Sequence, residues 1–279
     1  MRNKIAVTFL ATLLVFGITA CGMTSQEGKQ QSAGNPEPTK QGATIQVTTK
    51  PESVTPAMSN LNDDSISPVQ KKKNEKVQQY KEMNRRAEKG KTVFVGSSLM
   101  EQFPIVKFML KFDKDYRVYN RGISNYVTAD LLATMEECVF ELEPAKIFIN
   151  IGTNDIASPQ YRQEDLLANY DLILTRVKER LPKSKVFVMA YYPVNAKADF
   201  PGIDQTQKEQ LFKTRTNQAI QDANRAIEQL AKKHKVEFIN VNQGLMDAEG
   251  NLKQEYSKDG LHMVEKGYQV VFENLKKHL

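Results

Sequence analysis

Short apolar runs alternate with amphipathic segments from about residue 75 to the end of the chain, and this alternation limits the fold more than any other feature. The runs predict five strands: Thr92–Val95, Arg117–Tyr119, Lys146–Ile151, Lys185–Tyr191 and Val236–Val241. Strands that alternate with helices form a parallel sheet covered on both faces, so the sequence predicts an α/β domain. Ligands of such open sheets bind beyond the carboxyl ends of the strands.

Two of the intervening segments place their apolar residues on one face of a helix. The first set is Leu166, Tyr170, Ile173, Leu174, Val177 and Leu181, and the second is Leu211, Arg215, Ala219, Ala223, Ile227 and Leu230. Arg215 fits the second face if its apolar stem covers the core while its guanidinium reaches water. We therefore expect residues 211–230 to form one helix.

Four polar clusters follow predicted strands or precede the last helix. They are Gly96-Ser97-Ser98-Leu99, Asn120-Arg121-Gly122, Gly152-Thr153-Asn154-Asp155 and Asp259-Gly260-Leu261-His262. In a parallel sheet the carboxyl ends of the strands lie at one edge. We expect the four clusters to meet there.

Ser98 and His262 are the candidates for a nucleophile and its base. A serine hydroxyl is a poor nucleophile unless a base removes its proton. Among the three histidines, His278 is the penultimate residue and His234 lies in a charged run, which leaves His262 by elimination. Asp259 precedes His262 by three residues, close enough to accept a hydrogen bond from its ring and fix the tautomer.

Acyl transfer also requires hydrogen-bond donors placed where negative charge develops on the carbonyl oxygen. The Asn154 side chain and the backbone N–H groups of Ser98 and Gly122 are suitable donors. Glycine at position 122 permits a close approach of the backbone to a substrate.

Each of these residues has an ordinary structural explanation when it is considered by itself. Ser98 with Glu101 has the spacing of a helix cap, and Gly122 and Asn154 are common turn residues. In this order, however, the four clusters resemble the SGNH (GDSL) hydrolase family over about residues 92–279. The sequence departs from the family's Gly-Asp-Ser in having Ser97 in place of the aspartate, so Ser97 competes with Ser98 as nucleophile.

The resemblance implies a flavodoxin-like three-layer α/β/α domain with a parallel five-stranded sheet. It implies an esterase whose catalytic residues are Ser98, Asp259 and His262. Gly122 and Asn154 are its implied oxyanion donors, together with the Ser98 N–H. The two-step acyl transfer of such an esterase needs no cofactor.

The N-terminal part of the chain predicts export and anchoring. Residues 1–20 combine a basic start with an apolar run, as in a signal peptide. Ile18-Thr19-Ala20-Cys21 resembles the bacterial lipobox, which implies that Cys21 is lipidated and holds the protein on the outer side of a membrane. Residues 21–74 are polar and predict a flexible tether, which leaves 75–279 as the hydrolase domain.

Charge and cysteine content argue against other classes of protein. The net charge is +6, but basic residues are interspersed with acidic ones, which is unlike a nucleic-acid-binding surface. With Cys21 lipidated, Cys138 has no partner and is expected to be a buried structural thiol. The histidines show no spacing typical of metal ligands, so we expect no metal site.

The sequence therefore predicts a serine esterase that removes short acyl groups, such as acetyl, from glycans or other esters of the cell envelope. No long insertion is present that would form an apolar lid over a fatty chain. Two alternatives remain open. One is a surface lipoprotein that binds glycan without catalysis, and the other is a transferase that passes the acyl group to a sugar.

Overall fold

A computed structural model describes residues 66–279, so the predicted signal peptide, Cys21 and most of the predicted tether lie outside the described residues. The first helix, α1, spans Pro68–Asn84. Ser67 caps it by accepting a hydrogen bond from the Gln70 N–H, and proline is well suited to the first helical position. Residues 68–74, predicted as the end of the tether, are thus the first turns of a helix.

Five parallel strands form one sheet in the order β2-β1-β3-β4-β5. They are β1 (Thr92–Gly96), β2 (Val118–Gly122), β3 (Lys146–Asn150), β4 (Lys185–Met189) and β5 (Glu237–Ile239). This strand order is that of flavodoxin-like sheets, in which the order reverses between β1 and β3 and ligands bind beyond that point. The predicted fold class is confirmed.

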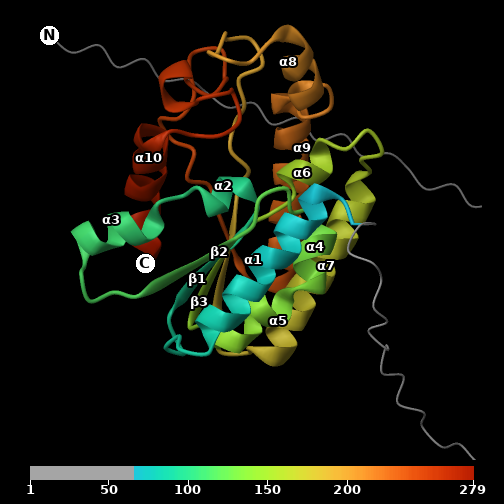
Figure 1. The fold of residues 1–279 in the computed structure, drawn as a ribbon. Coiled ribbons are helices and arrows are strands. Elements are labelled where there is room, and N and C mark those ends of the chain that lie inside the picture. Colours follow the sequence, from blue (N-terminus) through green and yellow to red (C-terminus); the bar gives the residue numbers. More distant parts are fainter. Residues whose placement is uncertain (1–65) are drawn as a thin grey trace, which may run out of the picture. The chain divides into compact units, whose positions relative to one another are not determined.

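Helices cover both faces of this sheet, as Figure 1 shows. α3 and α10 lie on one side and contact each other, whereas α1, α4, α5, α7 and α9 lie on the other. The helices after α1 are α2 (Ser98–Glu101), α3 (Ile105–Phe112), α4 (Thr128–Ala133), α5 (Met135–Cys138), α6 (Thr153–Ile156), α7 (Gln163–Arg180), α8 (Gln205–Phe212), α9 (Asn217–His234) and α10 (Glu265–Leu275). Short 3₁₀ turns span Phe140–Leu142, Gln254–Tyr256 and Lys276–His278.

A ladder of phenylalanine rings fixes the register at the centre of the sheet. Phe94, Phe148 and Phe187 are paired across β1, β3 and β4, and all three are fully buried. Their rings stack with centroid separations of 4.6 and 4.5 Å. A slip of one residue would turn these side chains to the opposite face. The ladder therefore aligns the strand ends that carry the polar clusters.

β4 and β5 end earlier than predicted, at Met189 and Ile239, and two larger differences concern β2 and α8. β2 continues through Gly122, although the predicted strand ended at Tyr119, because the polar residue Asn120 is satisfied by hydrogen bonds to the carbonyls of Met100 and Phe103. The predicted helix over 211–230 is interrupted after Phe212, and a second helix begins at Asn217 with Thr216 as its cap.

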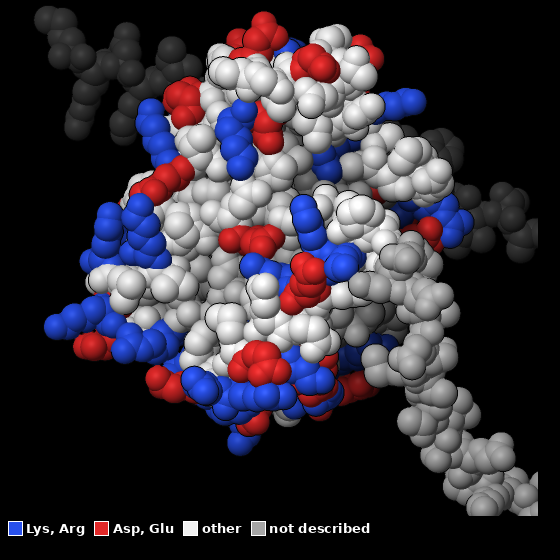
Figure 2. All heavy atoms as spheres, viewed as in Figure 1, with Lys and Arg blue, Asp and Glu red and all other residues white. Residues whose placement is uncertain are grey.

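The described residues include no helix with the length and apolar character needed to cross a bilayer. Acidic and basic side chains are interspersed over the face that Figure 2 presents, as the sequence composition leads one to expect.

Candidate active site

Ser98 lies at the sharp turn where β1 passes into α2. Ser97 is the N-cap of α2 and Ser98 is its first residue, only 7% exposed. Gly96 ends the strand, and a Cβ there would lie 2.1 Å from the Asn150 carbonyl oxygen. Glycine is therefore required for β1 and β3 to pack closely at the strand ends. The N–H of a residue at a helix start has no partner within the helix, which leaves that of Ser98 available to a ligand.

Ser98, His262 and Asp259 form a continuous hydrogen-bonded chain. Ser98 Oγ lies 2.9 Å from His262 Nε2, and His262 Nδ1 lies 2.6 Å from Asp259 Oδ2. An ionised aspartate can only accept, so Nδ1 carries the proton and Nε2 is left as an acceptor for the serine hydroxyl. The serine hydroxyl that meets the histidine is that of Ser98 and not that of Ser97.

The turn before α10 holds Asp259 in place and keeps it ionised. Its Oδ1 accepts hydrogen bonds from the backbone N–H groups of Leu261 and His262 at 2.9 and 2.6 Å. Burial acts to raise the pKa of Asp259, but the hydrogen bonds and the nearby His262 ring outweigh it and lower the pKa below the usual value. Gly260 adopts φ +85°, which is open to glycine, and packs against the carbonyl oxygen of Asn195.

Gly122 does not have the role predicted for it. Its N–H donates to Asn120 Oδ1 at 2.9 Å, so this group is not free to bind an oxyanion. Gly122 is instead needed for packing, because a Cβ there would lie 2.2 Å from the Glu101 nitrogen of α2. Sequence reasoning placed Gly122 after the strand, where a backbone donor faces a ligand, but it is the last residue of β2.

Asn125 is the residue of this region that the sequence analysis missed. Between Gly122 and Tyr126 the other N–H groups are used: those of Gly122, Ile123, Ser124 and Tyr126 donate to Asn120, Gly96, Glu101 and Ile123. The N–H of Asn125 has no such partner among the described residues, and its φ is +61°. Asparagine tolerates this left-handed conformation better than most residues. The sequence signal for this turn was the asparagine that follows Ser124.

Asn154 is held from both sides of its amide group. Its Nδ2 donates to the Tyr126 carbonyl oxygen at 3.0 Å, and its Oδ1 accepts from Arg215 Nη2 at 3.0 Å. Asp155, the next residue, accepts hydrogen bonds from the backbone N–H and the hydroxyl of Thr128. These contacts join the turn after β3 to the loop that contains Asn125.

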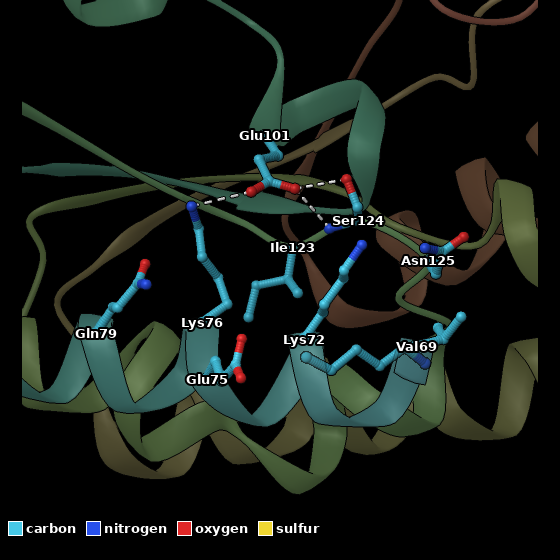
Figure 3. Close-up of a pocket in the computed structure, with 10 residues that line it drawn as sticks. Val69, Lys72, Glu75, Lys76, Gln79, Glu101, Ile123, Ser124 and Asn125 are labelled. Atoms are coloured by element: carbon cyan, nitrogen blue, oxygen red, sulfur yellow. Dashed lines mark hydrogen bonds and ion pairs between the residues drawn. The ribbon is translucent and has the colours of Figure 1, made fainter. Parts of the chain in front are cut away.

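Glu101 braces that loop from the nucleophile's own helix, as Figure 3 shows. It accepts from the N–H and the hydroxyl of Ser124 at 2.8 and 2.5 Å and pairs with Lys76 of α1 at 3.0 Å. Burial acts to raise the pKa of Glu101, but the hydrogen bonds from Ser124 and Lys76 lower it overall. Glu101 therefore ties the loop that contains Asn125 to α2 and α1.

His234 and Cys138, two other side chains of reactive type, have structural roles away from Ser98. His234 is paired through Nε2 with Asp171 at 2.8 Å, which links α9 to α7. Cys138 is buried, and burial raises its pKa to about 12, as expected of a structural thiol. Residues 66–279 contain no group of three or more histidine, cysteine or acidic side chains that is arranged to hold a metal ion.

A parallel α/β sheet with a Ser–His–Asp chain at the carboxyl ends of its strands has the architecture of a serine hydrolase. Residues 94–270 match the model of the GDSL-like lipase/acylhydrolase family, and the chain belongs to this family. It is an ester hydrolase of the SGNH type. The resemblance stated from the sequence is confirmed.

Similar solved structures come from several bacteria. A protein from Streptococcus pneumonia described as a platelet activating factor is 30% identical, with a TM-score of 0.67 over 75% of this chain and 94% of that one. A GDSL-like lipase from Bacteroides thetaiotaomicron is 28% identical, with a TM-score of 0.60 over 72% and 96%. An acetylxylan esterase from Geobacillus stearothermophilus, 16% identical with a TM-score of 0.53 over 68% and 94%, shares the fold.

A curated relative is an N-acylneuraminate cytidylyltransferase from Escherichia coli O18:K1:H7. The two sequences are 26% identical over 216 residues, which is 74% of this chain and 46% of the relative. The chain thus spans less than half the length of that protein.

Proposed function

We propose that this protein is a serine esterase that removes short acyl groups, acetyl above all, through an acyl-serine intermediate. The observation that carries the proposal is the chain of hydrogen bonds from Ser98 Oγ through His262 to Asp259. Such a chain provides a nucleophile, a base in the correct tautomer and a carboxylate that stabilises the imidazolium.

The reaction has two steps. Ser98 Oγ bonds to the acyl carbon while its proton passes to His262 Nε2, and the same proton is then given to the departing alcohol as the ester C–O bond breaks. Water next attacks the acyl-serine while His262 takes one of its protons. Release of the acid returns that proton to Ser98. Every proton is thus carried by one imidazole, whose orientation Asp259 maintains.

The tetrahedral intermediates need donors for their oxyanion. We assign this role to the N–H of Ser98, the N–H of Asn125 and Nδ2 of Asn154. Two observations support Asn125 in place of Gly122: its N–H lacks an acceptor among the described residues, and the neighbouring Tyr126 carbonyl holds the Asn154 amide. Asn154 Nδ2 has two hydrogens, and the bond to Tyr126 uses one of them.

A groove beside the loop that carries Asn125 supports a polar substrate. A groove of about 430 Å³ lies between α1 and the loop after β2 (Figure 3). Its lining is mostly polar, namely Val69, Lys72, Lys73, Glu75, Lys76, Gln79, Glu101, Ile123, Ser124 and Asn125. Ser98, Asp259 and His262 do not line this groove; it is linked to the proposed site by Asn125 and by Glu101, which follows Ser98 by three residues in α2. A groove of this kind suits the hydroxyl groups of an acylated glycan better than a fatty chain.

Ester assays with and without an acceptor test this function. We expect p-nitrophenyl acetate to be cleaved at least about tenfold faster, in kcat/KM, than the octanoate ester, because the groove offers few apolar contacts. A fluorophosphonate probe should label Ser98, as located by mass spectrometry. Absence of both turnover and labelling would favour a glycan-binding protein. Transfer of the acetyl group to an added oligosaccharide, with little free acetate, would favour the transferase.

We further propose that the protein is held on the outer side of a bacterial membrane by a lipid on Cys21, which places it near envelope glycans. The proposal rests on the lipobox-like Ile18-Thr19-Ala20-Cys21. Changing Cys21→Ser should move the protein from the membrane to the soluble fraction, because a lipidated cysteine is its anchor. The fractions are compared by immunoblotting. A Cys21→Ser protein that stays with the membranes would show that something else anchors it.

A further inference from the structure

Arg215 is a buried cation directly behind the proposed oxyanion donors. It is 4% exposed and lies in the segment between α8 and α9, so it is not the surface-reaching helix residue that the sequence predicted. Its guanidinium donates to three oxygens, each at 3.0 Å: the carbonyls of Thr153 and Leu211, and Asn154 Oδ1. Two of these three oxygens belong to α6, the short helix after β3 that contains Asn154.

The charge of Arg215 has no carboxylate in direct contact among the described residues. Burial lowers its pKa to about 10, while attraction to the Asp259 carboxylate acts in the opposite direction. The guanidinium is therefore protonated at neutral pH. A buried cation is costly to maintain without an ion pair, and the carbonyl contacts offset that cost in part. The cost of burying this charge suggests that the Arg215 guanidinium has a role in orienting the groups it contacts.

Chemistry fixes the orientation of the Asn154 amide once Arg215 is in place. A guanidinium has donors and no acceptor, so the Asn154 atom facing it must be the oxygen. The Tyr126 carbonyl can only accept, so the atom facing it must be the nitrogen. The two neighbours thus agree on one amide orientation. In the flipped orientation the guanidinium would face the amide NH₂ and the Tyr126 carbonyl would face the amide oxygen, so neither hydrogen bond could form.

We propose that Arg215 is a positioning residue that acts through Asn154: it holds the amide with Nδ2 presented to the ester carbonyl oxygen and makes that N–H a stronger donor. A charge-assisted hydrogen bond to Oδ1 draws electron density from the amide, and linked hydrogen bonds polarise one another. The effect is largest in the transition state, where the oxygen carries negative charge. This inference rests on the proposed function, because it presumes that Asn154 binds an oxyanion.

A double-mutant cycle in kcat for p-nitrophenyl acetate tests the proposal. Asn154→Ala should lower kcat by about 100-fold, the usual cost of one oxyanion donor. Arg215→Met, which keeps most of the apolar stem, should lower kcat by about 10- to 100-fold with KM changed less than about twofold. In the Asn154→Ala background, the same change should cost less than about threefold, because the residue through which Arg215 acts is absent.

If the fold-losses in kcat from Asn154→Ala and Arg215→Met multiply in the double variant, the proposal is wrong. An Arg215→Met effect confined to KM or to thermal stability would also overturn it. Arg215→Lys, taken through the same cycle, supplies a second variant that keeps the charge. A matched control is Arg121→Met, because Arg121 is also buried and donates to an asparagine Oδ1, that of Asn84. It should lower stability while leaving kcat within about twofold.

The experiment separates this inference from the proposed function. If Ser98→Ala is inactive and the losses from the two substitutions multiply, the esterase mechanism stands and the role of Arg215 is wrong. If Ser98→Ala keeps its activity, the proposed mechanism itself is wrong, whatever the cycle shows.

Discussion

Replacing Ser98 by alanine should lower kcat for p-nitrophenyl acetate on the order of 10⁶-fold, the loss expected when the nucleophile of a Ser–His–Asp site is removed. The hydroxyl of Ser98 is the atom that His262 contacts, so no other oxygen in the turn is prepared to lose a proton to it. Thermal unfolding should change little, because the substitution removes one small polar atom. Labelling by a fluorophosphonate should disappear together with turnover.

Ser97→Ala is the matched control, since it removes the same group one residue earlier in the same turn. Ser97 is the N-cap of α2 but makes no side-chain cap hydrogen bond, so a substitution there should cost less than about tenfold in kcat. Loss of activity in Ser97→Ala with activity kept in Ser98→Ala would transfer the nucleophile to Ser97.

The residues of the triad could be predicted from the sequence because the four polar clusters occur together in one order, although each cluster is a weak signal by itself. Ser98 follows an apolar strand, and His262 stands three residues after an aspartate near the last helix. The five strands are equally visible, since strands of a parallel sheet are buried on both faces and read as apolar runs. The sheet order then brings the ends of β1 and β3 together, as the sequence led us to expect.

The supporting residues could not be predicted because their roles depend on tertiary hydrogen bonds. Gly122 has the sequence context of a loop glycine, yet its N–H is taken by Asn120. Arg215 has helical spacing with its neighbours, but helix α8 ends before it, and its guanidinium donates to Asn154. Asn125 differs from an ordinary turn asparagine because its N–H has no acceptor among residues 66–279. No periodicity in the sequence carries such information.

Changing Asp259 to asparagine should lower kcat by about 10⁴-fold, with KM nearly unchanged. An asparagine can present its NH₂ to Nδ1 of His262, which favours the tautomer with the proton on Nε2. That nitrogen then donates to Ser98 and cannot act as its base. Steady-state kinetics at neutral pH measure the loss. A decrease of less than about tenfold would show that Asp259 does not set the tautomer of His262.

Stability should depend on pH through the same residue. The pKa of Asp259 is lowered by folding, so its ionised form stabilises the protein above the pKa of an unfolded aspartate, about 3.9. This contribution is lost as the pH falls through the lowered, folded-state value. Urea unfolding should therefore find Asp259→Asn less stable than the wild type at pH 7, with the difference shrinking at acid pH. A difference independent of pH would show that charge is not its origin.

Asp171→Asn is the control that separates catalysis from the general effect of losing an Asp–His pair. Asp171 also pairs with a histidine ring, that of His234, at 2.8 Å, but it joins α7 to α9 and not the turn that carries His262. Its substitution should leave kcat within about twofold. Because the two variants remove the same kind of contact, a large loss in Asp259→Asn and a small one in Asp171→Asn would assign the catalytic effect to the hydrogen bond that orients His262 toward Ser98.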